Sequence, residues 1–178
     1  MSSNGKFDDL SPIADCIRLD TLVLNCAIDQ LDFVVDLPLM KYLAVDSCTL
    51  NASLHVLADS NISMLRLSAV RNLTNIDALA AWDHLAFLHL SLPKVERLCD
   101  FSHMRNLRQL ELDYMKSLQE IKNLWTADKL EVLMLKEIHR NQGGSLGRLG
   151  GYGLPAAGRL PFYRFRQRPD CRHPQANG

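Results

Sequence analysis

Two stretches of the chain, far apart in sequence, carry the same arrangement of apolar residues. Residues 107–121 read LRQLELDYMKSLQEI, with leucine at positions 107, 110, 112 and 118 and isoleucine at position 121. Residues 62–76 read ISMLRLSAVRNLTNI, and their apolar residues fall at positions 62, 65, 67, 73 and 76. The same apolar skeleton under unrelated polar residues indicates that each stretch fills the same place in a repeated core.

The central part of this skeleton, LxxLxL, recurs six times at nearly constant spacing. Its middle apolar residue lies at positions 22, 43, 65, 88, 110 and 133, so successive copies are 21 to 23 residues apart. A repeat of this length predicts a solenoid, because each unit can bury its apolar face only against its neighbours.

The spacing within each copy predicts a strand followed by a return segment. The last two apolar residues of LxxLxL are two positions apart, so both point to the same side of a strand. Such short strands are stable only when stacked, which predicts a parallel sheet. The return segments, such as NIDALAAWDHL and EIKNLWTADKL, have apolar residues three and four positions apart. They are expected to form short helices or 3₁₀ turns, with Trp82 and Trp125 partly buried.

This pattern resembles the leucine-rich repeat over about residues 17–139. The unit that begins at Leu88 fits best, and it is similar to the short repeat class, of about 22 residues, found in internalin-like and other bacterial proteins. The resemblance implies an α/β fold. It would be a right-handed, slightly curved solenoid with a short parallel β-sheet on the concave face and short helices or 3₁₀ turns on the convex face.

The chain departs from the family pattern in its turns. The family usually has asparagine or cysteine three residues after the last leucine of each strand. Only Cys48 fits here, and the other copies have Ala27, Val70, Pro93 and Met115. The turns must therefore satisfy their backbone amides in another way.

Charge divides the chain into parts. Residues 1–139 hold 13 Lys+Arg and 19 Asp+Glu, a balance of −6, whereas residues 140–178 hold seven Arg and one Asp, a balance of +6. We expect residues 1–16 to form a partial cap, with Leu10, Ile13 and Ile17 against the first layer, and residues 17–139 to form about six repeats. Residues 140–178 are rich in Gly, Pro and Arg. Three interpretations stay open for them: a disordered basic tail, the product of a frameshift that removed further repeats, or a cap or nucleic-acid-binding arm.

The candidate binding residues lie between the leucines, on the side of each strand that faces away from the core. Tyr42, Met64 and Phe87 should form a continuous apolar stripe, because neighbouring strands are about 4.8 Å apart. A second column, containing Arg66, His89 and Glu111, runs beside it. An apolar anchor beside arginine and other polar groups is typical of a binding hot spot.

The complete candidate set is Tyr42, Met64, Arg66, Phe87, His89, Gln109, Glu111 and Met134. Two other interpretations are scattered exposed apolar residues without a role, and cover by the tail.

Catalytic and cofactor chemistry is not indicated. His89 and Glu111 could share a hydrogen bond, but general acid–base catalysis would need a third partner and a pocket that excludes water. No GxxxxGK, GxGxxG or GxSxG motif occurs, the histidines lack HxxxH spacing, and the cysteines lack CxxC spacing. Cys26 and Cys48 are expected to be small buried hydrophobic residues. The sequence therefore predicts no enzyme activity, no cofactor and no metal site.

The sequence predicts a module that recognises a partner protein. The first residues, MSSNGKFDDLSPIADC, contain no apolar stretch, and no apolar run approaches the length of a membrane span, so a cytoplasmic location is expected. An immunity protein, a regulatory adaptor and an effector all fit this description. The alternative from another class is a nucleic-acid-binding protein that uses the basic C-terminal tail.

Overall fold

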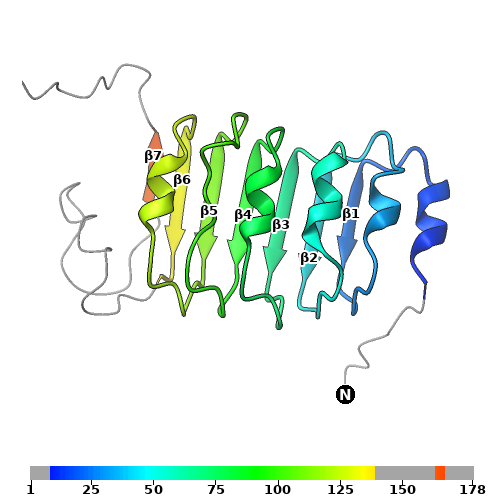
Figure 1. Ribbon diagram of the computed structural model, residues 1–178, viewed down its shortest axis with the longest axis horizontal. Coiled ribbons are helices and arrows are strands. Elements are labelled where there is room, and N and C mark those ends of the chain that lie inside the picture. Colours follow the sequence, from blue (N-terminus) through cyan, green and yellow to red (C-terminus); the bar gives the residue numbers. More distant parts are fainter. Residues whose placement is uncertain (1–8, 139–162, 167–178) are drawn as a thin grey trace, which may run out of the picture.

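The fold is a stack of short parallel strands with return segments on one side (Figure 1). The computed structural model describes residues 9–138 and 163–166. Its six parallel strands are hydrogen-bonded in chain order. They are β1 (Thr21–Leu24), β2 (Tyr42–Asp46), β3 (Met64–Ser68), β4 (Phe87–Ser91), β5 (Gln109–Asp113) and β6 (Val132–Lys136).

Four of the five segments that connect the parallel strands contain a 3₁₀ helix, as the three- and four-residue spacing of their apolar residues predicted. These helices are η2 (Asp32–Val34), η3 (Leu54–Asp59), η4 (Asp77–Ala81) and η5 (Lys122–Thr126), and a further 3₁₀ helix, η1 (Ser11–Asp15), precedes β1. The helices η2 to η5 lie over the same face of the sheet, and η1 continues their row beyond β1 (Figure 1). The segment between β4 and β5 is described throughout and contains no helix, although the repeat beginning at Leu88 matches the family pattern best.

The strand register is the one that the LxxLxL spacing predicts. The middle leucine of each motif is aligned with the middle leucine of the next motif. The last apolar residues, two positions further along each strand, are aligned with one another in the same way. Leu43, Leu65, Leu88 and Leu110 are fully buried in the core between the sheet and the 3₁₀ segments. A slip of one residue in any strand would turn its leucines outward, so burial of this row fixes the register.

In the absence of an asparagine ladder, side chains from neighbouring repeats form hydrogen bonds with backbone N–H and carbonyl groups of the turns. The side chain of Asn72 accepts from the Leu50 amide at 2.9 Å and donates to the Leu50 carbonyl at 2.7 Å. Further along, Asn123 donates to the Leu98 carbonyl at 2.8 Å, and the Thr126 hydroxyl accepts from the Phe101 amide at 2.8 Å. Each bond joins one repeat to the next, so the turns link the layers.

Four turns contain a residue with positive φ just after the strand. These residues are Ser47 (54°), Ala69 (51°), Tyr114 (50°) and Glu137 (50°). None is glycine, although the left-handed region costs other residues roughly 1–2 kcal/mol. The conformation lets the Ser47, Ala69 and Tyr114 amides donate across to the next repeat at 2.8–3.0 Å.

The two ends of the stack differ. At the N-terminal end, Leu10 and Ile13 pack against the core, but Ile17 is 62% exposed, so it does not pack as the sequence suggested. At the other end β7 (Tyr163–Arg166) pairs antiparallel with β6, with Leu133 opposite Phe165. The rest of the tail lies outside the described residues, and its three interpretations stay predictions. Within the described parts of the chain, no helix is long and apolar enough to span a membrane.

Truncating one leucine of the buried row should destabilise the whole stack. Leu110→Ala removes a fully buried side chain and leaves a cavity between β4 and β6. We expect a loss of about 2–5 kcal/mol in the free energy of unfolding, measured by urea denaturation followed by circular dichroism. The exposed Lys94→Ala variant should change it by less than about 0.5 kcal/mol. Equal stability of both variants would contradict the proposed core.

Candidate functional site

The candidate residues share one face of the sheet, the face opposite the 3₁₀ segments, which we call the open sheet face. Pairing aligns them in two columns across successive strands. The first column is Thr21, Tyr42, Met64, Phe87, Gln109 and Val132, and the second is Val23, Ala44, Arg66, His89, Glu111 and Met134. The structure therefore places all eight candidate residues on one surface, in the predicted order.

The apolar stripe of the first column is partly open to solvent. Met64 is 37% exposed, and its direct neighbours Tyr42 on β2 and Phe87 on β4 are half-buried. These three side chains come from adjacent strands and present a band of carbon and sulfur to the solvent. Partial burial restricts their rotation, so less conformational entropy would be lost on binding.

A hydrogen-bonded group of three side chains lies next to the stripe. His89 Nδ1 and Glu111 Oε2 are 3.0 Å apart across β4 and β5, and Gln109 Nε2 donates to Glu111 Oε1 at 2.6 Å. The His89 and Glu111 side chains are 12% and 23% exposed. Both carboxylate oxygens of Glu111 are thus engaged within the face, which holds the three side chains in fixed positions.

Arg66 differs from the other charged groups on this face. It lies in register with Ala44 on β2 and His89 on β4, and its Nε atom is buried without a hydrogen-bond partner. Ala44 is itself buried and presents only a methyl group on that side of the arginine. The sequence identified Arg66 as a candidate, but it did not show that this guanidinium would lack a partner.

The C-terminal side of the face is closed by further pairings. Met134 on β6 is half-buried and aligns with Glu111 on one side and Arg164 of β7 on the other. Next to it, Lys136 Nζ lies 3.6 Å from Asp113 Oδ2. The sequence analysis missed β7, although the alternation of aromatic and basic residues in YRFR is a two-residue period typical of strands.

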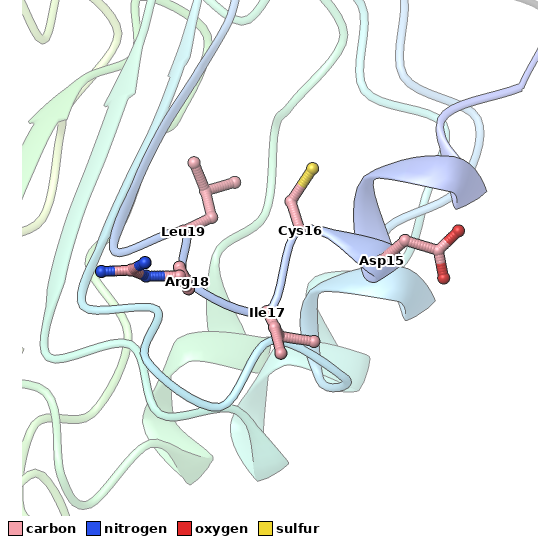
Figure 2. A pocket seen from close by; sticks show the side chains of 5 residues that line it. All are labelled: Asp15, Cys16, Ile17, Arg18 and Leu19. Atoms are coloured by element: carbon pink, nitrogen blue, oxygen red, sulfur yellow. The ribbon is translucent and has the colours of Figure 1, made fainter.

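Two hollows at the N-terminal end do not have the composition of a catalytic site. The larger, of about 660 Å³, lies between η1 and β1 and is lined mainly by apolar residues, including Leu10, Ile13 and Leu22. The second, of about 440 Å³, is formed by the chain from Asp15 to Leu19. Figure 2 shows the Asp15 carboxylate and the Arg18 guanidinium pointing in opposite directions, so these charged groups do not converge.

The cysteines described are free thiols, and most of them are buried. Cys26 and Cys48 are 6% and 2% exposed, which confirms their expected place in the core. Burial raises the pKa of Cys48 to about 11 and that of Cys99 to about 12. These thiols are therefore protonated at neutral pH and poorly suited to nucleophilic chemistry. Among the residues described, no three His, Cys, Asp or Glu side chains are grouped so as to hold a metal ion.

This architecture is a leucine-rich repeat solenoid, with a parallel strand and a short return segment in each layer. The crystal structure of an internalin from Listeria monocytogenes is similar, with a TM-score of 0.59 and 17% sequence identity over 77% of this chain. The match covers 40% of the internalin, so the chain spans less than half the length of that protein. Internalin C2 from the same organism matches with a TM-score of 0.24 and 16% identity, over 68% of this chain and 83% of its own, which is too low to support an argument. No family model matches the sequence, and no curated protein matches it.

Thiol reactivity should follow burial. With a pKa of about 11, roughly 0.1% of the Cys48 thiol is ionised at pH 8, and the thiolate is the reactive form. We expect iodoacetamide to alkylate the exposed Cys16 first, and Cys48 and Cys99 at least about a hundredfold more slowly, because both also lack solvent access. Timed alkylation followed by peptide mass spectrometry measures these rates. Alkylation of Cys99 as fast as Cys16 in folded protein would contradict the described core.

Proposed function

We propose that this chain is a non-enzymatic recognition module that binds a partner protein through its open sheet face. The observation that carries the proposal is the alignment of Tyr42, Met64 and Phe87 on three adjacent strands, next to a polar group that is already ordered. Partly exposed apolar and aromatic side chains held on a rigid scaffold are the usual anchors of protein interfaces.

The size of the face limits the kind of complex. Six strands span about 24 Å, since five intervals of about 4.8 Å separate them. With about 10 Å of exposed backbone for each strand, the face offers a few hundred Å², which is below the roughly 800 Å² per partner of a standard interface. A partner would need either to contact the adjoining turns as well or to bind as a short segment. Tyr114, in the turn after β5, is 40% exposed and lies below the Lys116 ammonium group, 4.4 Å from its ring centroid, so it could extend the contact surface.

Several biological roles would use such a face. An immunity protein, a regulatory adaptor and an effector each bind a protein without catalysis, and a cytoplasmic location with reduced cysteines suits all three. The alternative of nucleic-acid binding depends on the basic tail, most of which lies outside the described residues. A complex led by that tail would weaken steeply as salt rises, whereas one formed on the apolar stripe would not.

Phe87→Arg should weaken binding of the partner without unfolding the chain. The variant places a charge in the middle of the stripe, and we expect it to weaken the complex at least about tenfold. The measurement is a pull-down from the native cytoplasm with partners identified by mass spectrometry, after circular dichroism has shown that the variant is folded. Trp125→Arg is the matched control, because this aromatic residue is 49% exposed but lies in η5 on the opposite face.

A protein retained by wild type and by Trp125→Arg but lost by Phe87→Arg would support the open sheet face. A partner retained by all three chains would contradict it. Recovery of nucleic acid, with binding that falls as salt rises, would favour the tail instead.

A further inference from the structure

Charge on the open sheet face is compensated at nearly every position. Glu111 accepts hydrogen bonds from His89 and Gln109, and Asp113 lies beside Lys136. The remaining acid of the face, Asp46, accepts from the hydroxyl of its neighbour Ser47 at 2.9 Å. No acidic side chain of this face is thus committed to Arg66.

Arg66 has neither an ion pair nor a hydrogen bond to any residue of the described part of the chain, and its Nε atom is buried. A buried donor without an acceptor is rare in folded proteins and costs stability unless something outside the chain satisfies it. The position is also asymmetric, because His89 is occupied by Glu111 on one side and Ala44 presents only a methyl group on the other. An external acceptor could therefore approach the guanidinium from the side of β2.

From these observations we infer that the partner places a single carboxylate on Arg66 and an apolar side chain on the neighbouring stripe of Tyr42, Met64 and Phe87. The inference rests on the proposed function and specifies what the open sheet face recognises. A planar carboxylate matches the paired N–H groups of a guanidinium, which form two parallel hydrogen bonds with it.

The net charge of residues 1–139 argues for one carboxylate within an apolar segment rather than a polyanion. Residues 1–139 carry 13 basic and 19 acidic side chains, a balance of −6. A nucleic acid or a highly acidic protein would be repelled by the solenoid as a whole. A short, mostly apolar segment with one acidic group is repelled only weakly, and its carboxylate still supplies an acceptor for the Arg66 guanidinium. The carboxylate can come from an Asp or Glu side chain or from the C-terminus of the segment.

Selection from random peptides tests this inference without knowledge of the natural partner. The full chain is used to select from two phage-displayed libraries of random dodecapeptides, one with both peptide ends tethered and one with a free C-terminus. We expect enrichment of peptides that combine one acid with aromatic or aliphatic residues. Enrichment in both libraries identifies a side-chain carboxylate, and enrichment confined to the second identifies the C-terminal one.

Affinities of the selected peptides for Arg66→Gln and Arg105→Gln then isolate the contact. Arg105 is exposed, precedes β5, and undergoes the same change in charge. Arg66→Gln should weaken binding roughly 10- to 100-fold, and Arg105→Gln should leave it within about twofold. Arg66→Gln should also leave the melting temperature of the free chain unchanged or raised, because the arginine has no partner to lose. A purely structural role would lower it.

The possible failures are distinguishable. Peptides that lose affinity for Phe87→Arg but not for Arg66→Gln, and that lack a common acid, would overturn this inference and leave the proposed function intact. Peptides that bind Phe87→Arg as well as wild type would overturn both. The absence of any enriched peptide in either library would overturn this inference alone, because a larger partner that also contacts the turns would still be compatible with the proposed function.

Discussion

The stacking of one buried apolar layer on the next is the constraint on which the rest of this structure depends. Strands of four or five residues have too few hydrogen bonds and too little buried area to persist alone. The row of leucines from Leu22 to Leu133, continuous across six strands, stabilises the sheet together with the other buried residues of the core. Because side chains alternate along a strand, fixing this row also fixes which residues point outward. The open sheet face is thus a consequence of the core.

The turns add a second level of coupling between repeats. Asn72, Asn123 and Thr126 each bond the backbone of the preceding repeat, in place of the asparagine ladder that is usual in this architecture. The bonds occur at different positions in different repeats, so the turns are less uniform than the strands. Ser47, Ala69 and Tyr114 have positive φ, and their backbone amides donate to carbonyls of the next repeat, so local strain accompanies a second set of bonds between repeats.

Periodic features of the fold could be predicted from the sequence, and features that depend on a single contact could not. The register of Leu65 and Leu88, and hence the columns of Tyr42 and Arg66, followed from spacing because burial allows one solution. Trp82 and Trp125 occupy similar places in the sequence of their return segments, and both were expected to be partly buried. Trp82 is instead fully buried and Trp125 is 49% exposed. Trp82 follows the last residue of η4, whereas Trp125 lies within η5, so the two residues do not occupy the same place in their 3₁₀ helices.

The candidate site also had a part that the sequence predicts and a part that it does not. Which residues lie on the open sheet face could be predicted, because every residue between the leucines must face away from the core. The hydrogen bonds within the candidate site could not be predicted, because the alternation of side chains along a strand does not show which neighbouring side chains are hydrogen-bonded. The Glu111 carboxylate engages His89 and Gln109, and the Arg66 guanidinium engages none of the residues described. The buried Ala44 and the pairing of β7 with β6 likewise depend on contacts between distant segments.

The exposure of Met64 tests the central claim that one apolar column faces outward while the leucine row faces inward. Hydrogen peroxide oxidises accessible methionine, and the chain provides internal controls: Met64 is 37% exposed, whereas Met40, Met104 and Met115 are at most 2% exposed. Oxidation rates from peptide mass spectrometry of the folded chain would measure the difference. The account predicts rapid oxidation of Met64, slow oxidation of the three buried residues, and protection of Met64 when a selected peptide is bound. Oxidation of Met64 as slow as that of Met40 would contradict the strand register and, with it, the proposed site.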